Sequence, residues 1–358
     1  MDNESCQIDA PGPSQTDWDY QETSLHEVSR TFALTIPELP TPLRHVVGNA
    51  YLLCRIADTI EDATSLSVDE KKQFSELFLH AVAEDGAAEA FARTVVPRLA
   101  GGAGTSEIDL VENAPRVLRI THSFSARDQA ALRRCVQIMI EGMGRFQEGQ
   151  YTHGFQDQDQ LDAYCYHVAG VVGEMLTELF CAHSRRVADR KETLSALAVS
   201  FGQGLQMTNI LKDLWDDKKR DVCWLPQSAF PGGSVDLRRL SESDRGEAFE
   251  RGLVYLIGVT RGHLEDAMRY ALLIPKSEKG IRRFCLWAIG LAVLTLRNIN
   301  WRRNFTSGAQ IKVSRRSVYA TILATRVLGW SNTLLRLVFG LLALGLPRVR
   351  ARSGHSSA

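Results

Sequence analysis

"YLLCRIADTIEDA", residues 51–63, places charged residues at helical spacing within an otherwise largely apolar stretch. Wound as an α-helix at about 100° per residue, it gathers Tyr51, Arg55, Asp58 and Asp62 within about 60° of arc. Two like charges at positions i and i+4 destabilise a bare helix. The pattern therefore predicts a helix with an apolar face in the core and a polar face that serves something other than helix stability. The apolar face comprises Leu52, Leu53, Ile56 and Ile60.

A second stretch, "FGQGLQMTNILKDLWDD" at residues 201–217, repeats this arrangement. Gln206, Asn209, Asp213 and Asp217 fall within about 80° of arc. Four carboxylates and an amide are hard oxygen ligands of the kind that Mg²⁺ prefers, with Mn²⁺ as the alternative. Without a cation the acids repel one another, so the predicted ligand is a Mg²⁺-bound diphosphate. The opposite, apolar face comprises Met207, Leu211, Leu214 and Trp215.

Cationic and hydroxyl side chains lie close to both acidic stretches in the sequence. "SRTF" at residues 29–32 supplies Ser29 and Arg30, and Arg55 and Arg220 adjoin the two acid pairs. Arginine presents a planar fork of donors that matches phosphate oxygens. Together with Tyr51, Gln206 and Asn209, these residues are predicted to bind the diphosphate substrate.

A third segment, "YCYHVAGVVGEM" at residues 164–175, is predicted to form an apolar helix. One face carries small residues, which let another backbone approach closely. The other face either packs in the core or lines a tunnel for a long hydrocarbon, and the pattern does not separate these alternatives. The small face comprises Ala169, Gly170 and Gly173, and the larger face comprises Tyr164, Val168, Val171 and Met175.

The composition favours an all-α intracellular protein. The chain has 358 residues, 44% of them hydrophobic, with 42 basic and 42 acidic residues, which gives no polyanion-binding signature and argues against nucleic acid as a partner. Clusters of Pro and Gly separate helical segments, and no run alternates like a strand. The seven cysteines include no CxxC pair and favour reduced thiols over disulfides or zinc.

We expect a disordered leader at 1–21, a helical catalytic domain at 22–325 and a tail at 326–358.

The tail is predicted to associate with a membrane. From Lys279 onward there are fourteen Lys or Arg and no Asp or Glu, and residues 327–352 read "VLGWSNTLLRLVFGLLALGLPRVRAR". The uncharged apolar run is shorter than the roughly 20 residues of a spanning helix, so it suits the membrane interface. A C-terminal helix packed on the domain is the alternative. The expected location is the cytoplasmic face of a membrane, bound peripherally.

Four blocks of this chain resemble the ordered motifs of the squalene and phytoene synthase family. They are "SRTFALTIPELP" at 29–40, "YLLCRIADTIEDA" at 51–63, "YCYHVAGVVG" at 164–173 and "QMTNILKDLWDDKKRDVCWLP" at 206–226. The resemblance covers about residues 25–325, and "DTIED" is similar to the squalene-synthase form of the first acidic motif. Squalene synthases often have proline where this chain has Ala288. The resemblance implies a single large isoprenoid-synthase-type helical domain with a central active-site cavity.

The resemblance also implies a reaction: Mg²⁺-dependent head-to-head (1'-1) condensation of two farnesyl diphosphates, followed by NADPH-dependent rearrangement of presqualene diphosphate to squalene. Tyr164 matches the tyrosine that steers proton loss, and Phe32 and Phe284 match aromatics beside the carbocation. The implied metal ligands are Asp58, Asp62, Asn209, Asp213 and Asp217, and the implied NADPH contacts are Asn209, Lys312 and Arg315.

One alternative function is a phytoene-type or dehydrosqualene synthase, which lacks the reduction step. Another is a catalytically inactive family member that acts as a membrane assembly factor. The presence of all four aspartates disfavours the inactive alternative. A generic Mg²⁺-binding helical protein leaves the ordered blocks unexplained. No dinucleotide fingerprint is present, so NADPH would bind without a Rossmann unit. A monomer is expected.

Overall fold

A computed structural model of the chain describes residues 12–29, 31–147, 153–230, 235–240 and 246–349. Within these ranges the protein is all-α, as the sequence predicts. Phe155 and Pro226 form an isolated β-bridge. The chain divides into two compact units, residues 1–33 with 41–140 and residues 34–40 with 141–358. The predicted central cavity of a single domain stays a prediction.

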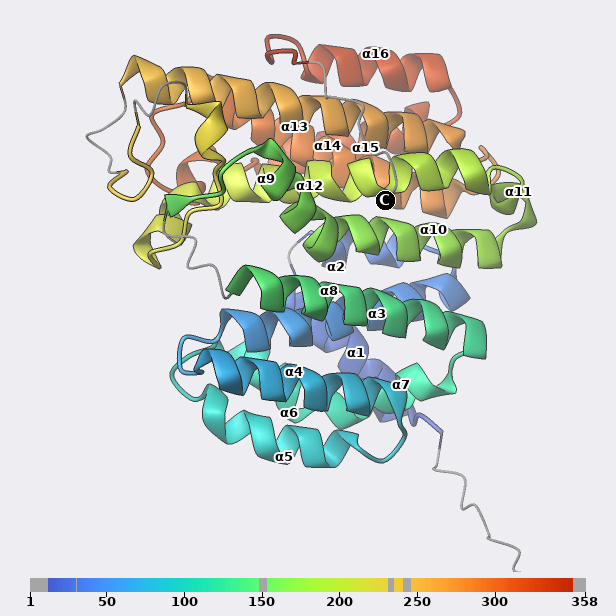
Figure 1. The fold of residues 1–358 in the computed structure, drawn as a ribbon. Helices are drawn as coiled ribbons and strands as arrows, with labels where there is room; N and C mark the ends of the chain where they lie inside the picture. The colour runs from blue at the N-terminus through green and yellow to red at the C-terminus, as the bar shows by residue number, and fades with distance from the viewer. Residues whose placement is uncertain (1–11, 30, 148–152, 231–234, 241–245, 350–358) are drawn as a thin grey trace, which may run out of the picture. The chain divides into compact units, whose positions relative to one another are not determined.

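Unit 1 is built around the helix predicted from the opening motif. This helix, α3, packs against α1, α4, α6 and α7 (Figure 1). Leu52, Leu53, Ile56 and Ile60 are completely buried, which confirms the predicted apolar face. The helices of this unit are α1 (Gln15–Val28), α3 (Thr41–Asp62), α4 (Val68–Ala83), α5 (Ala88–Leu99), α6 (Thr105–Glu112), α7 (Ala114–Ser123) and the first part of α8 (Ala126–Gln147), and α2 (Phe32–Thr35) begins in it.

A buried polar network fixes α3 against its neighbours. Asn49 is fully buried and donates to Gln21 Oε1 of α1 at 3.1 Å and to the Val117 carbonyl of α7 at 2.9 Å. Thr121 donates to Asn49 Oδ1 at 2.7 Å. Because a buried amide is costly unless its hydrogen bonds are made, this network favours one seating of α3.

The predicted leader is too long. Ser14 caps α1 through a capping box with Asp17, so the chain is helical from Gln15. Asp17 is buried and forms an ion pair with Arg119 at 3.0 Å. The sequence interpretation took the polar composition of this stretch as a sign of disorder, but its polar residues are cap and ion-pair partners. Residues 1–11 lie outside the described ranges.

Unit 2 is organised around the long helix α12, which carries the second acidic stretch. α12 packs against α10, α13 and α14, and Met207, Leu211, Leu214 and Trp215 are buried as predicted. The elements of this unit are η1 (Ile36–Glu38), α9 (Gln158–Cys165), the π-helix η3 (Tyr166–Gly170), α10 (Val171–His183), α11 (Arg185–Ala188), α12 (Lys191–Lys219), η4 (Gln227–Ala229), α13 (Glu247–Leu273), α14 (Lys279–Trp301), η6 (Gly308–Ile311), α15 (Arg315–Leu328) and α16 (Asn332–Leu342).

The small-residue face predicted for residues 164–175 does permit close approach. A Cβ built on Gly173 would lie 2.2 Å from the Ala198 carbonyl oxygen of α12. A Cβ on Gly202 of α12 would lie 2.1 Å from the carbonyl oxygen of Ala169. Real side chains do not tolerate such distances, so glycine is required at both positions for this helix contact.

The described part of the C-terminal tail packs on unit 2 and is not separate from it. α15 runs through the predicted boundary at residue 325, and α16 contacts both α14 and α15. Arg282 of α14 is buried and donates to the Ile274 carbonyl at 2.7 Å and to Asn332 Oδ1 at 2.8 Å. The alternative of a C-terminal helix packed on the domain is therefore observed. Leu335 and Leu346 are buried where this segment packs on the rest of unit 2.

Among the described residues, one helix is long and apolar enough to cross a membrane. This helix is α14, and 61% of its most apolar window is buried inside the structure. α16 is also apolar, but its 11 residues are too few for a span of about 20.

Candidate functional site

The polar face of α3 places two carboxylates one turn apart at its C-terminal end. Asp58 is half-buried and Asp62 is exposed. Burial, together with the charge of Asp62, raises the pKa of Asp58 from 3.8 to about 7, while Arg55 acts in the opposite direction. The ionised pair is thus unfavourable without a compensating cation.

Arg55 lies on the same face but already has an acidic partner. Its Nη2 donates to Glu107 Oε1 of α6 at 2.6 Å, while its buried Nε has no hydrogen-bond partner. Glu107 fixes one side of the guanidinium and leaves a donor for a further acceptor such as a phosphate oxygen. The sequence interpretation missed Glu107, since no helical spacing links it to α3.

Ser29, Phe32 and Tyr51 come together at the other end of the polar face. Ser29 Oγ accepts from the Phe32 amide at 3.0 Å, and the Phe32 and Tyr51 rings lie 5.2 Å apart. Tyr51 donates to the Val28 carbonyl at 3.2 Å. The "SRTF" turn is therefore held against α3 beside Tyr51, and the shared role of these residues in binding a diphosphate stays a prediction. Arg30 lies outside the described residues.

On α12 the predicted acids differ in their surroundings. Asp213 is partly exposed and pairs with Lys212 at 3.0 Å. Asp217 is buried and accepts from Arg220 at 2.6 Å. Gln206 is half-buried and Asn209 is exposed on the same stretch. Arg220 and Asp217 were predicted to contact phosphate and metal respectively, but in this structure they bind each other.

The turn that ends α12 places the Arg220 side chain next to Asp217. The Asp221 amide donates to the Lys218 carbonyl at 3.1 Å and the Val222 amide to the Asp217 carbonyl at 3.1 Å. Asp221 has φ = 59°, the left-handed conformation that such a helix-capping turn needs. Asp tolerates this conformation better than most residues.

The segment before Lys312 lies against the acidic face of α12. A Cβ on Gly308 of η6 would lie 3.4 Å from Asp213 Oδ1, and Asn298 of α14 donates to the Ile311 carbonyl at 3.0 Å. Lys312 follows η6 and is exposed, and Arg315 is exposed in the first turn of α15. The segment that precedes Lys312 therefore lies next to Asp213 of α12.

Tyr164 is buried in a cluster of aromatic rings. It stacks on Trp224 with ring centroids 4.4 Å apart and planes inclined by 11°. Phe146 meets it edge-on at 5.4 Å, and Phe155 lies 5.5 Å away. The ring of Tyr164 is therefore held in one orientation by its neighbours.

Trp224 is a candidate site residue that the helical spacing did not identify. It lies in a loop, where the bridge between Phe155 and Pro226 aligns two distant segments. Gly154, with φ = 78°, permits this pairing, because a Cβ there would lie 2.3 Å from the Leu225 carbonyl oxygen. The signal available in the sequence was its place in the "DVCWLP" part of the fourth block.

A π-helical turn follows Tyr164 directly. η3 widens the helix at Tyr166–Gly170, between α9 and α10. The face predicted for Tyr164, Val168, Val171 and Met175 assumed regular α-helical winding, which the π-turn interrupts; Tyr164, Val171 and Met175 are nevertheless buried. π-turns are rare and are frequent at functional sites.

Phe284 lies in the core of unit 2. It is buried on α14 and packs edge-on against Phe180 of α10, with ring centroids 6.0 Å apart. Its suggested contact with a carbocation stays a prediction.

The donor chemistry of both acidic stretches fits Mg²⁺. Each contributes carboxylate oxygens at i and i+4, and burial with the charge of Asp62 raises the pKa of Asp58, so a bound cation would stabilise the ionised pair. Within the described ranges no group of three or more His, Cys, Asp or Glu is close enough to hold a metal ion. Mg²⁺ commonly takes one or two carboxylates and completes its shell with substrate phosphate and water.

Comparison with solved structures identifies the fold. A structure of TcSQS in complex with the ligand E5700 matches with a TM-score of 0.70 and 22% identity, covering 92% of each chain. A dehydrosqualene synthase in complex with a ligand matches with a TM-score of 0.59 and 19% identity, covering 87% of this chain and 96% of the other. This chain therefore has the all-α isoprenoid-synthase-type fold of those proteins.

Comparison of sequences gives the family. Squalene synthase 1 of Arabidopsis thaliana is 28% identical over 295 residues, which are 80% of this chain and 67% of the plant protein. This chain thus spans about two thirds of the length of such relatives. The model of the squalene/phytoene synthase family matches residues 25–317, which include all four motif blocks. The chain belongs to the squalene/phytoene synthase family.

Proposed function

We propose that the protein condenses two molecules of farnesyl diphosphate head to head to presqualene diphosphate and then reduces this intermediate with NADPH to squalene. The observation that carries the proposal is the Asp58–Asp62 pair of α3 in a chain of this family. Burial and the Asp62 charge raise the pKa of Asp58 to about 7, so the ionised pair favours a bound cation.

Bound Mg²⁺ would neutralise the negative charge that develops on a departing diphosphate. Asp58 and Asp62 would hold the cation on α3. On α12, Asn209, Asp213 and Asp217 would offer oxygen ligands of the same kind. Mn²⁺ has the same preference for oxygen ligands and is the expected substitute.

The cationic and hydroxyl side chains bind and orient the diphosphates. Arg55, anchored by Glu107, offers its buried Nε to a phosphate oxygen. Ser29 lies beside Tyr51 and can present its hydroxyl to the same group. Arg220 exchanges Asp217 for phosphate as substrate binds, which frees the carboxylate for the cation. Gln206 and Arg30 are proposed to contribute further contacts.

Tyr164 serves the first condensation. When one allylic diphosphate ionises, the double bond of the second substrate attacks the cation, and a proton must leave the carbon that closes the cyclopropane ring. We assign the steering of this proton loss to the Tyr164 hydroxyl, because Trp224 and Phe146 fix its ring. The enclosing rings also exclude water, and Phe32 and Phe284 offer aromatic faces to a carbocation.

The reduction step is assigned to NADPH near the C-terminal part of unit 2. Lys312 and Arg315 are exposed cations in a segment without acidic residues, which fits the phosphates of a dinucleotide. Asn209 is exposed on α12, one turn before Asp213, and completes the proposed set. We further propose that the protein acts as a monomer, bound peripherally at the cytoplasmic face of a membrane.

The test is to incubate the purified full chain with farnesyl diphosphate and Mg²⁺, with and without NADPH, and to identify the products by gas chromatography and mass spectrometry. Squalene with NADPH and presqualene diphosphate without it are the expected products. No turnover of any prenyl diphosphate would refute the assignment.

A second candidate function is a phytoene-type or dehydrosqualene synthase, favoured by the fold shared with a solved dehydrosqualene synthase. Such an enzyme uses the same acids and lacks the reduction. Formation of dehydrosqualene regardless of NADPH, or of phytoene from a longer diphosphate, would select it.

A further inference from the structure

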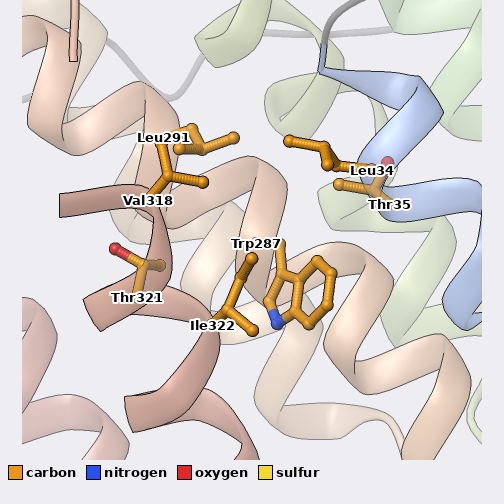
Figure 2. A pocket seen from close by; sticks show the side chains of 7 residues that line it. All are labelled: Leu34, Thr35, Trp287, Leu291, Val318, Thr321 and Ile322. Carbon is orange, nitrogen blue, oxygen red and sulfur yellow. The ribbon is translucent and has the colours of Figure 1, made fainter. Parts of the chain in front are cut away.

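The narrow apolar pocket of unit 2 has no charged side chain in its lining. Residues of α2, α14 and α15 line it, as Figure 2 shows: Leu34, Thr35, Trp287, Leu291, Val318, Thr321 and Ile322. A site that orients a polar ligand needs convergent polar groups. The acid pair of α3 in unit 1 lies among such groups, and one of them, Glu107, belongs to a different helix, α6.

Arg55 has two acidic neighbours, and its side chain is directed to only one of them. Asp58 follows Arg55 by three residues on α3, which makes the two side chains neighbours on the helix surface, and their charges attract. Arg55 Nη2 nevertheless donates its hydrogen bond to Glu107 Oε1 at 2.6 Å. The side chains of this ion pair are only 30% and 25% exposed, so solvent screens it weakly.

The start of α6 fixes the position of the Glu107 carboxylate. Glu107 is the third residue of α6, and Gly104 is the N-cap of that helix. A Cβ on Gly104 would lie 2.2 Å from Glu107 Oε2, so the carboxylate occupies space that a side chain at position 104 would need. A helix N-terminus also favours a negative charge. One carboxylate oxygen thus lies over Gly104 while the other accepts from Arg55.

The loop before α6 is itself tied to the chain that follows α3. The Thr64 amide donates to the Gly102 carbonyl at 3.2 Å. A Cβ on Gly102 would lie 2.2 Å from Ser65 Oγ, and α6 packs against α3. Glu107 therefore reaches Arg55 from a position that is fixed relative to the end of α3.

An arginine that turned to Asp58 would compete with a cation for the same carboxylate oxygens, because charge-assisted hydrogen bonds to a carboxylate are strong. We propose that Glu107 is a positioning residue that holds Arg55 away from Asp58, and so keeps the Asp58–Asp62 pair open to a divalent cation. This inference rests on the proposed function, since the cation is the one that the diphosphate reaction needs.

The first test is the binding of Mn²⁺ to the purified full chain, measured from the electron paramagnetic resonance signal of the free ion. Glu107→Gln is expected to weaken Mn²⁺ binding about fivefold, because Arg55 then pairs with Asp58. Gly104→Ala keeps the Glu107 carboxylate but displaces it, and is expected to weaken binding in the same direction.

The matched control is Glu112→Gln, which removes an exposed acid from the other end of α6 and is expected to bind Mn²⁺ like the native chain. Circular dichroism and melting temperature show whether each variant is folded. If Glu107→Gln does not fold, Gly104→Ala decides the outcome.

A double-mutant cycle separates the position of Arg55 from the charge of Glu107. In the Arg55→Gln background the competing guanidinium is absent, so Glu107→Gln is expected to cause no further loss of Mn²⁺ affinity. An effect of the negative charge alone would persist in that background and would overturn the inference.

Turnover of farnesyl diphosphate gives a second measurement. Glu107→Gln is expected to raise the Mg²⁺ concentration for half-maximal turnover about fivefold, with a smaller change at saturating Mg²⁺, because excess cation displaces Arg55 from Asp58. Equal Mn²⁺ affinity of the native and folded variant chains overturns the inference and leaves the proposed function intact, as does absence of Mn²⁺ binding by an active native chain. A native chain that turns over no prenyl diphosphate refutes the proposed function instead.

Discussion

Asp58 occupies an environment that disfavours its own charge, so its replacement separates function from stability. Asp58→Asn is expected to lower turnover of farnesyl diphosphate at least about 100-fold, since a carboxylate that serves the developing charge is lost. In EDTA at mildly alkaline pH the same variant is expected to gain about 1 kcal/mol in free energy of unfolding, because repulsion with Asp62 is relieved. Steady-state kinetics and urea unfolding measure the two effects.

Glu76→Gln is the matched control for Asp58→Asn, because Glu76 is an exposed acid on α4 of the same unit. It is expected to change neither turnover nor stability appreciably. A stable Asp58→Asn variant with full activity would remove Asp58 from the proposed site.

Trp224 is expected to act as a positioning residue for Tyr164. Trp224→Leu removes the ring stacked at 4.4 Å and frees Tyr164 to rotate. The rate of presqualene diphosphate formation should fall about 10- to 100-fold with little change in KM, because misplacement by a small distance costs rate more than binding. Trp224→Phe should restore most of the rate. Single-turnover kinetics test this, and a larger effect on KM than on rate would contradict it.

His45 is expected to make the free energy of unfolding depend on pH. Burial, with a contribution from Arg44, lowers the pKa of His45 from its ordinary value of 6.5, and its ring stacks on Trp18. The unfolded chain therefore takes up a proton here before the folded chain does, so the free energy of unfolding falls as pH drops below 6.5.

His45→Phe should lack this part of the pH dependence while keeping the ring contact with Trp18. Urea unfolding at neutral and mildly acidic pH, with an NMR titration of His45, measures the effect. An NMR pKa at or above the ordinary value would show that the assignment is wrong.

At the scale of elements, the contact between α12 and the π-helix η3 depends on glycine. Gly202→Ala places a methyl group 2.1 Å from the Ala169 carbonyl oxygen, so backbone must move. We expect a loss of about 1–3 kcal/mol in free energy of unfolding, and also reduced activity, since η3 adjoins Tyr164. Thermal and urea unfolding measure the loss.

The control is Gly144→Ala, the same substitution in α8 at a site where no atom lies within 4 Å of the new methyl group. Alanine is the better helix former, so this variant is expected to be about 1 kcal/mol more stable. If both variants have the same stability, the close approach of α12 and η3 is not a constraint on folding.

Helical winding predicted two elements well and a third incompletely. On α3 and α12 the apolar residues opposite the acids are buried as the 100° winding predicts, because both helices are regular throughout the motif. Between Tyr164 and Met175 the π-helix interrupts the winding. A π-turn is stabilised by packing against neighbouring helices, and no local residue pattern encodes it.

For the whole molecule, the C-terminal segment is expected to contribute to the stability of unit 2. Deleting residues 329–358 removes two acceptors of the buried Arg282, Gly329 and Asn332, and exposes the surface that Leu335 covers. Leaving a buried charge with fewer partners is costly, and we expect a loss of about 3 kcal/mol or more. Thermal unfolding and limited proteolysis of unit 2 measure it.

Leu341→Gln is the control for this deletion, because it alters only the exposed face of α16 and should leave the melting temperature unchanged. If the truncated chain has the native melting temperature, residues 329–358 do not contribute to the stability of unit 2.

From the sequence alone we could predict the all-α class, the two acid-bearing helices with their buried faces, and the motif blocks that indicate the family. These features follow from periodicity and local spacing, which can be read from the sequence without knowledge of the tertiary contacts. The tertiary structure decided which residues meet across long separations: Glu107 on Arg55, Trp224 on Tyr164, and α16 on α14. It also showed that Ser14 and Asp17 cap α1 and that Asp17 pairs with Arg119 of α7. Such contacts join segments far apart in the chain, and their energy depends on burial, which no local pattern specifies.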